Sequence, residues 1–157
     1  MNTLKSNLDI TDRAILCELQ RDARLSYAEI GRRVGLSSPA VQERVHKLED
    51  AGIIKGYHAV IDTDKIGLPI RAIVKMRGSC RYSNVFMEAV QDIPEVMQCH
   101  HVLGEDCFYL LVAVASMPHL ETLLESLYEY AETETTMILT SPLERRLIDL
   151  NAFVQES

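Results

Sequence analysis

The stretch LSSPAVQERVHKLEDAGII, residues 36–54, places hydrogen-bonding side chains along one side of a predicted helix. At 100° per residue, Val45 and Leu48 fall within about 40° of Val41, so these three residues form a narrow apolar stripe. The residues that point away from the stripe are Pro39, Gln42, Glu43, His46 and Asp50. One side of this helix is therefore expected to pack, and the other to contact a polar partner.

The outward side chains have the chemistry that reads base edges in a DNA groove. A Gln amide bonds bidentately to adenine, a Glu carboxylate accepts from cytosine, and a Ser hydroxyl bonds a base or a phosphate. Predicted base contacts are Ser37, Ser38, Pro39, Gln42, Glu43 and His46. Predicted phosphate contacts are Arg32, Arg33, Arg44, Lys47 and Lys55. The alternative for this stretch is an ordinary amphipathic helix with a solvated outer face.

Capping residues indicate that two short helices precede this one. A first helix is predicted from about Asp12 to Asp22, with Asp9 or Thr11 as its cap. Ser26 and Glu29 have the spacing of a capping box, which predicts a second helix of two turns that ends at Gly35. Ser37 or Ser38 caps the third helix, Pro39 suits its first turn, and Gly52 closes it. This order predicts a helix-turn-helix, in which the second helix of the motif enters the major groove.

The charge is uneven along the 157 residues, whose net charge is −7. Residues 1–60 hold nine Lys/Arg and eight Asp/Glu, about +1, and residues 61–157 hold seven and fifteen, about −8, which together give −7. The acidic total excludes a uniformly basic DNA-coating protein, because phosphate contact needs Lys and Arg. The two parts are expected to have different functions.

The remaining sequence predicts an α+β chain. Residues 53–62 suggest a short strand or a two-stranded wing, and residues 62–69 a linker rich in turn residues. Strands are then predicted at 70–77, 96–103, 107–115 and 135–143, with helices at 82–91 and 118–130. This βαββαβ order is the ferredoxin-like motif with a four-stranded antiparallel sheet. The predicted domains are a winged helix-turn-helix at 1–61, the linker at 62–69 and the ferredoxin-like domain at 70–157.

The stretch CFYLLVAVA, residues 107–115, is apolar on both faces of its predicted strand. Two helices cover only one face of a four-stranded antiparallel sheet, so the other face needs a second cover. A second copy of the chain is the simplest cover, which predicts a homodimer.

The sequence indicates neither catalysis nor a metal or cofactor site. It has no nucleophile elbow, phosphate loop or paired-carboxylate motif. A metal or redox site can be drawn from Cys99, His101 and Cys107, but no fourth ligand stands at a zinc spacing. The four cysteines form no CxxC pair and are expected to be reduced, mostly buried thiols. No run of eighteen apolar residues is present, and we expect a cytoplasmic protein.

Several motifs in the first 68 residues resemble the Lrp/AsnC family of transcriptional regulators. They are LDITDRAIL, DARLS, VGLS, RVHKLEDAGIIKGY and KIGL, and the similarity continues through the βαββαβ part. The resemblance implies a sequence-specific DNA-binding regulator that forms dimers, often octamers, and responds to amino acids or related small molecules.

The family's small-molecule site centres on a GxxD loop between the second and third strands of its C-terminal domain. The matching residues here are Gly104, Glu105, Asp106 and Cys107, so a thiol stands at the position of the family's Asp. Asp106 comes one position early and, by strand alternation, should face the other way unless the turn is remodelled. Thr136 matches the family's TxT motif on the last strand. The alternative is that residues 104–107 form only a hairpin turn.

Two other functions stay open from the sequence. One is an architectural protein that wraps or bridges DNA with little sequence preference. The other is a ligand-sensing or enzymatic module, since βαββαβ sheets also occur in metabolic enzymes. The absence of a catalytic constellation places the second alternative last.

Overall fold

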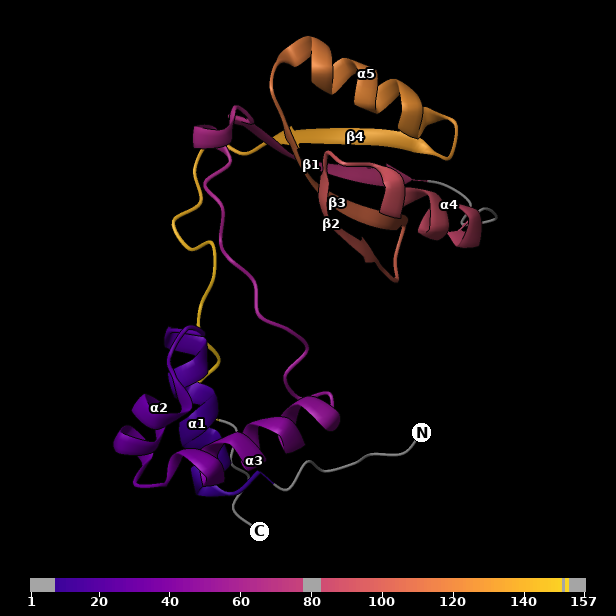
Figure 1. Cartoon of the computed structure of the whole chain (residues 1–157). Coiled ribbons are helices and arrows are strands. Elements are labelled where there is room, and N and C mark those ends of the chain that lie inside the picture. Colours follow the sequence, from indigo (N-terminus) through magenta and orange to yellow (C-terminus); the bar gives the residue numbers. More distant parts are fainter. Residues whose placement is uncertain (1–7, 78–82, 151, 153–157) are drawn as a thin grey trace. The chain divides into compact units, whose positions relative to one another are not determined.

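The computed structural model describes residues 8–77, 83–150 and 152, and shows two compact units (Figure 1). The helical unit contains the chain up to Ala59 together with the segment from Leu143, and the sheet unit contains Val60–Pro142. From the sequence, the segment from Leu143 was predicted to belong to the ferredoxin-like domain. Tyr82, where a helix was predicted to begin, and Cys80 lie outside the described residues.

The helical unit begins with the three predicted helices, α1 (Ile10–Arg21), α2 (Tyr27–Val34) and α3 (Ser38–Asp50). Asp9, Ser26 and Ser37 are their N-caps. The Ser26–Glu29 capping box is present as predicted, and a second box joins Asp9 to Asp12. Gly35 ends α2 with φ 74°, a left-handed conformation that favours glycine.

The core of the helical unit is small and fully apolar. Ile15 of α1, Ile30 of α2, and Val41 and Val45 of α3 are all 0% exposed and form one cluster. Each buried aliphatic side chain contributes roughly 1.5–3 kcal/mol relative to an exposed one. The predicted stripe of α3 is thus the face that packs.

Gly31 of α2 lies against the turn between α2 and α3. A Cβ atom at this position would stand 2.4 Å from the carbonyl oxygen of Leu36, and the Leu36 amide donates to the Gly31 carbonyl at 2.9 Å. The close approach of two backbones therefore requires glycine here, and it fixes how tightly α3 follows α2.

The predicted wing is wrong, because residues 53–62 form no strand. The hydroxyl of Tyr57 donates to Glu49 of α3 at 2.9 Å, so this segment begins against the helix. A two-stranded ribbon is marginal even when both strands are available, and the described part of the helical unit contains no strand to pair with.

The sheet unit has the predicted βαββαβ order. It consists of β1 (Ile70–Arg77), α4 (Ser83–Ala89), β2 (Val96–His101), β3 (Asp106–Val114), α5 (Met117–Tyr128) and β4 (Glu132–Met137). Short 3₁₀ helices, η1 (Asp64–Ile66) and η3 (Val90–Asp92), precede β1 and follow α4. The antiparallel strands lie in the order β2-β3-β1-β4. β4 ends at Met137 and not at 143, since its partner β1 begins at Ile70 and the two pair only up to Ala72 and Met137.

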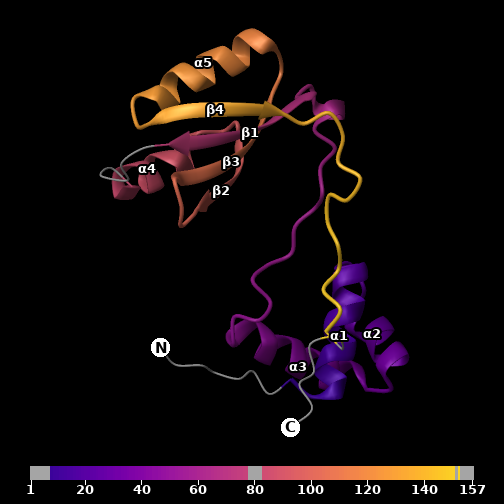
Figure 2. The same ribbon diagram turned by 180° about the vertical axis from the view of Figure 1, so that it is seen from behind.

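Both helices of the sheet unit cover one face of the sheet. Phe86 of α4 and Leu120, Leu123 and Leu127 of α5 pack with the side chains of β1 and β3 that point to this side. The rings of Phe86 and Phe108 have centroids 4.9 Å apart. Figure 2 shows α5 running alongside β4. The opposite face, which we call the open face, carries no helix among the described residues.

The side-chain amide of Gln20 binds the C-terminal segment to α1. Gln20 donates from Nε2 to the carbonyl of Ile148 at 3.1 Å and accepts from the Ile148 amide at 2.8 Å. Ile148 itself is 60% exposed, so these paired hydrogen bonds hold the segment where little apolar area is buried.

The prediction of four reduced thiols is wrong for Cys107, which is disulfide-bonded in the structure. Cys17 and Cys99 are free. Burial raises the pKa of the Cys99 thiol, which keeps it protonated and poorly reactive. The error arose because distance along the sequence says little about which cysteines meet in a fold.

We expect Gly31→Ala to destabilise the protein by about 1–3 kcal/mol, the usual cost of forcing extra atoms into a packed site. The added Cβ would displace the Leu36 carbonyl and open the turn that sets α3 against α2. Chemical denaturation measures the free energy of unfolding. Gly104→Ala is the matched control, since a Cβ there meets nothing within 4 Å. Equal stability of both variants would contradict the tight-turn assignment.

Candidate DNA-binding and effector sites

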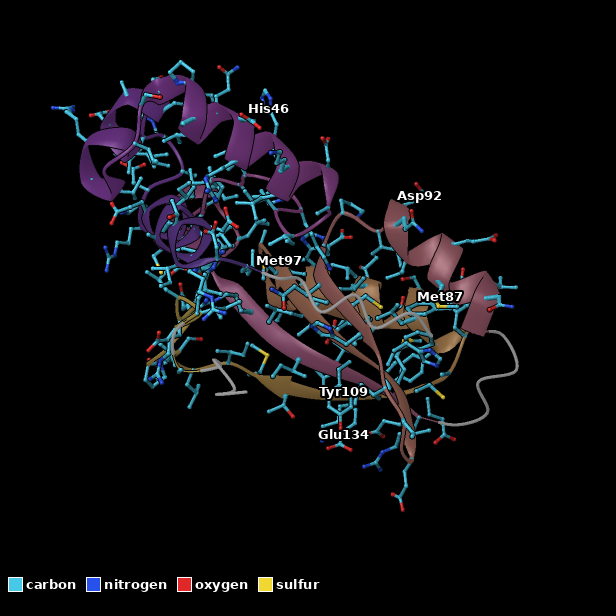
Figure 3. All side chains as sticks on the ribbon, turned by 90° about the horizontal axis from the view of Figure 1, so that it is seen from below. His46, Met87, Asp92, Met97, Tyr109 and Glu134 are labelled. Carbon is cyan, nitrogen blue, oxygen red and sulfur yellow. The ribbon has the colours of Figure 1, made fainter. Side chains whose placement is uncertain are left out.

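The six residues predicted to contact bases gather on one exposed side of α3 and its cap. They are Ser37, Ser38, Pro39, Gln42, Glu43 and His46, all of them exposed. His46 points away from the helix axis (Figure 3). The burial of Val41 and Val45 on the opposite side is what turns this polar face outward.

Ser37 has a structural function in addition to any contact it makes. Its hydroxyl oxygen accepts from the Ala40 amide at 3.4 Å, which caps α3. The hydroxyl hydrogen stays available, because a serine that accepts as a cap can still donate. Ser38 and Pro39 then open the first turn of α3.

Two of the predicted phosphate contacts are engaged in ion pairs. Arg33 pairs with Glu18 of α1, and this contact lowers the pKa of the Glu18 carboxyl. Lys47 lies 2.6 Å from Glu43 on α3, with side chains 71% and 68% exposed. The exposed Lys47–Glu43 pair contributes at most about 1 kcal/mol, so Lys47 can exchange its partner for a phosphate. Arg33 is held more firmly, because the Glu18 side chain is only 13% exposed.

Arg44 differs from these cations because it is shared between two carboxylates. Its Nη1 atom lies 2.6 Å from Asp9 and 2.7 Å from Asp12, and its side chain is only 33% exposed. Of the five predicted phosphate contacts, Arg32 and Lys55 form no ion pair with any described residue, and both are exposed. The structure thus separates two free cations from three paired ones.

The residues of the predicted effector site divide between the two faces of the sheet. Cys107 is 5% exposed and belongs to the core beneath the helices. Asp106 points the other way, because the register between β1 and β3 shifts between Met76 and Arg77, and Arg77 then faces Asp106. The turn is therefore remodelled by a bulge, which brings the carboxylate of Asp106 to the open face.

Asp106 forms a compact polar group with two neighbours. The hydroxyl of Tyr109 donates to Oδ2 at 2.7 Å, and Nε of Arg77 lies 3.1 Å from Oδ1. The Tyr109 hydrogen bond, and after it the Arg77 charge, lower the pKa of the Asp106 carboxyl. The same contact raises the pKa of the Tyr109 phenol. Asp106 is therefore an anion, and Tyr109 a neutral donor, at neutral pH.

β4 adds a second carboxylate and a hydroxyl to the open face. Glu134 lies opposite Lys75 in the ladder, and Thr136 lies opposite Ile73. Glu134 accepts from Lys75 at 3.1 Å and pairs with Arg77 at 2.7 Å. Tyr109 and Glu134 project on the same side of the sheet (Figure 3). This cluster joins two cations, two anions and a phenol, and Thr136 lies on the same face of the sheet.

Four members of this cluster were not identified from the sequence: Lys75, Arg77, Tyr109 and Glu134. Strand alternation could have found Lys75 with Arg77, and Glu134 with Thr136, because residues two apart share a face. Tyr109 lies opposite Lys75 in the regular part of the ladder, whereas the bulge that turns Asp106 to this face has no such signal. Gly104 and Glu105 are exposed in the β2–β3 turn, and the charge of Glu105 helps to raise the pKa of Arg77.

The part of the chain that the structure describes holds no group of three or more His, Cys, Asp or Glu residues that could bind a metal ion. Cys99, His101 and Cys107 do not form such a group; His101 instead stacks on Phe108 with ring centroids 4.9 Å apart. Among the described residues no helix combines the length and apolar character needed to cross a membrane.

Comparison with known proteins assigns a family to each unit. The family model of the AsnC-type helix-turn-helix domain matches residues 8–49, and that of the Lrp/AsnC ligand binding domain matches residues 71–148.

The chain is 36% identical to the HTH-type transcriptional regulator LrpC of Bacillus subtilis, over 85% of this chain and 92% of LrpC. It is 37% identical to the leucine-responsive regulatory protein of Escherichia coli, over 75% of this chain and 74% of that protein.

Solved structures show the same fold. The structure of B. subtilis LrpC matches with a TM-score of 0.81 at 35% identity, covering 88% of this chain and 99% of that one. A transcriptional regulator of Neisseria meningitidis in complex with L-Met matches with a TM-score of 0.84 at 27% identity, covering 94% and 99%. This chain belongs to the Lrp/AsnC family of transcriptional regulators.

Proposed function

We propose that this protein regulates transcription by inserting α3 into the major groove of specific DNA sites. The observation that carries the proposal is the outward polar face of α3, fixed by a buried apolar stripe and an N-cap. Gln42, Glu43 and His46 read bases, and Ser37, Ser38 and Pro39 lie at the end of the helix that enters the groove first. The protein acts in the cytoplasm, where its DNA is.

The surrounding cations make the phosphate contacts, and they differ in whether they must first leave an ion pair. Arg32 and Lys55 are free to bind phosphates, and Lys47 can do so by leaving its exposed partner Glu43. Arg33 must leave the less exposed Glu18, so its phosphate contact costs more. Such contacts position the protein on the duplex without reading its sequence. The relatives are named as regulators, which does not favour the alternative of an architectural DNA-wrapping protein.

The effector is an amino acid that binds at the open face of the sheet. The cluster there offers Asp106 and Glu134 to an ammonium group, and Lys75 and Arg77 to a carboxylate. Thr136, Gly104, Glu105 and the backbone at Cys107 complete the surroundings of the bound molecule. The L-Met complex of the Neisseria relative and the name of the E. coli relative support this class of ligand.

A second copy of the chain covers the open face and makes the protein a homodimer, which can assemble further into an octamer. Ile73 is 37% exposed at the centre of this face, and Leu111 beside it is only half-buried. Apolar side chains in the middle of an uncovered sheet favour burial against a partner.

We expect the variants Arg32→Gln and Gln42→Ala to weaken DNA binding in different ways. Loss of a phosphate contact lowers the slope of log K against log salt by about 1 on every sequence, whereas loss of a base contact relaxes specificity at one position. Fluorescence anisotropy over a range of salt concentrations measures both. Lys65→Gln, which removes one cation from η1, outside the helical unit, is the control. Identical effects of both variants on selected and scrambled DNA would contradict the assignments.

The function itself is tested by selecting bound sequences from random DNA, alone and with L-leucine or L-methionine. We expect one enriched, roughly palindromic sequence whose binding changes with at least one of the amino acids. In Asp106→Asn the same sequence is enriched but the amino-acid response is lost, while Glu121→Gln on α5 behaves like wild type. No enrichment would refute specific DNA reading; enrichment with no response to either ligand would refute only the effector assignment.

The dimer is tested by Ile73→Asp, which places a charge in the middle of the open face. We expect sedimentation velocity to show the variant as a monomer at concentrations where the wild type is a dimer, because a buried unpaired carboxylate is costly. Val85→Asp on α4, at a position that is 56% exposed, should stay dimeric. A dimeric Ile73→Asp protein would place the interface elsewhere.

A further inference from the structure

Arg44 joins the recognition helix α3 to the beginning of α1. A single guanidinium nitrogen, Nη1, lies 2.6 Å from Oδ2 of Asp9 and 2.7 Å from Oδ1 of Asp12. These contacts span 35 and 32 residues of sequence. They are the side-chain hydrogen bonds that connect α3 with α1 among the described residues.

The two carboxylates that hold Arg44 also form the capping box of α1. The Asp12 amide donates to Oδ1 of Asp9 at 2.7 Å, and the Asp9 amide donates to Oδ2 of Asp12 at 3.2 Å. Each carboxylate thus uses one oxygen for the helix cap and the other for Arg44. The cap holds both acceptor oxygens in place. Through Arg44, the first turn of α1 therefore fixes the orientation of α3.

Arg44 points away from the part of the reading face that Gln42 and His46 form. With Val41 at 0°, Gln42 and His46 stand at about 100° and 140°, and Arg44 at about 300°, roughly 160° from both. Its side chain is 33% exposed, whereas the reading residues are exposed. The position of Arg44 on the helix and its contacts with Asp9 and Asp12 both indicate that its side chain faces α1. The two observations are independent.

The charges around Arg44 favour its contacts with Asp9 and Asp12 over a contact with a phosphate. Two carboxylates surround one guanidinium, so the cluster has a net charge of −1, and Asp12 is only 18% exposed. The Asp12 backbone hydrogen bond, followed by the Arg44 contact, lowers the pKa of Asp9, and both carboxylates raise the pKa of Arg44. Asp9 and Arg44 therefore remain charged at neutral pH.

We propose that Arg44 is a positioning residue for DNA reading, which sets the angle of α3 through Asp9 and Asp12 and contacts no phosphate. This proposal rests on the DNA-binding function, and it replaces the phosphate contact predicted for Arg44 from the sequence. The residue acts through the helix: it keeps Gln42 and His46 at the geometry that the correct bases require.

Two variants separate positioning from phosphate contact. Arg44→Gln removes the cation. The double variant Asp9→Asn, Asp12→Asn removes both partner charges but keeps an amide oxygen at each position, and Asn is as good an N-cap as Asp. If Arg44 bound phosphate, the double variant would free it and would strengthen binding to the selected sequence. If Arg44 positions α3, the same variant weakens that binding relative to scrambled DNA.

The experiment uses the full chain and the sequence that wild type selects from random DNA, together with a scrambled version. For both variants we expect the ratio of selected to scrambled affinity to fall on the order of tenfold, equivalent to about 1.4 kcal/mol. The salt slope of Arg44→Gln on scrambled DNA stays at the wild-type value. Combining all three substitutions should cost no more than either variant alone, since they break the same contact.

Arg32→Gln is the matched control, because it removes an arginine that is free of ion pairs with described residues; its salt slope falls by about 1 and its affinity ratio is preserved. A preserved ratio in Arg44→Gln, or a slope lowered by about 1, would overturn the proposal. If Arg44→Gln does not fold, as judged by thermal unfolding, the double variant decides the question. A fall in its ratio of selected to scrambled affinity supports positioning, and a rise in its affinity for the selected sequence without such a fall contradicts it. If no sequence is selected by wild type, DNA reading fails first, and that outcome is distinguishable from a failure of positioning.

Discussion

The burial of one apolar stripe of α3 is the constraint on which the DNA-binding unit depends. Val41 and Val45 are 0% exposed and pack with Ile15 and Ile30, so α3 has only one stable rotation about its own axis. That rotation turns Gln42, Glu43 and His46 outward. The N-cap at Ser37 and the close backbone approach at Gly31 then define where the helix begins and how it leaves the turn.

Most of the cations around the recognition helix form ion pairs within the protein and are not free to attract DNA. The chain has a net charge of −7, and three of the five cations around the recognition helix are bound to carboxylates. A surface with few free cations binds random DNA weakly, because non-specific affinity comes almost entirely from phosphate contacts. Specific contacts then make a larger share of the total binding free energy, which suits a protein that must find particular sites.

A single irregularity organises the proposed effector site in the sheet unit. The shift in register between Met76 and Arg77 moves Asp106 to the open face, where Arg77 and Tyr109 hold it. Cys107 occupies the position of the family's aspartate in the sequence but packs in the core. The carboxylate is thus supplied from the neighbouring residue. This face also exposes Ile73, so a second copy of the chain would lie beside the bound ligand.

Local chemistry in the sequence was enough to predict the helices, their caps and the βαββαβ order. Capping boxes, helix-ending glycines and side-chain periodicity act over a few residues, and each leaves a readable signal. The residues of the reading face follow from the same periodicity. The wing failed as a prediction because a strand needs a partner, and strand-like composition alone does not provide one.

Contacts between distant residues were decided only by the tertiary structure. Nothing near Arg44 in sequence indicates that Asp9 and Asp12 would bind it, and nothing near Cys107 indicates its disulfide bond or the bulge that turns Asp106 around. The pairing of Gln20 with Ile148 is another such contact. Periodicity assigns a side chain to a face, but its partner depends on which other elements the fold packs against that face, and this packing is a property of the whole chain.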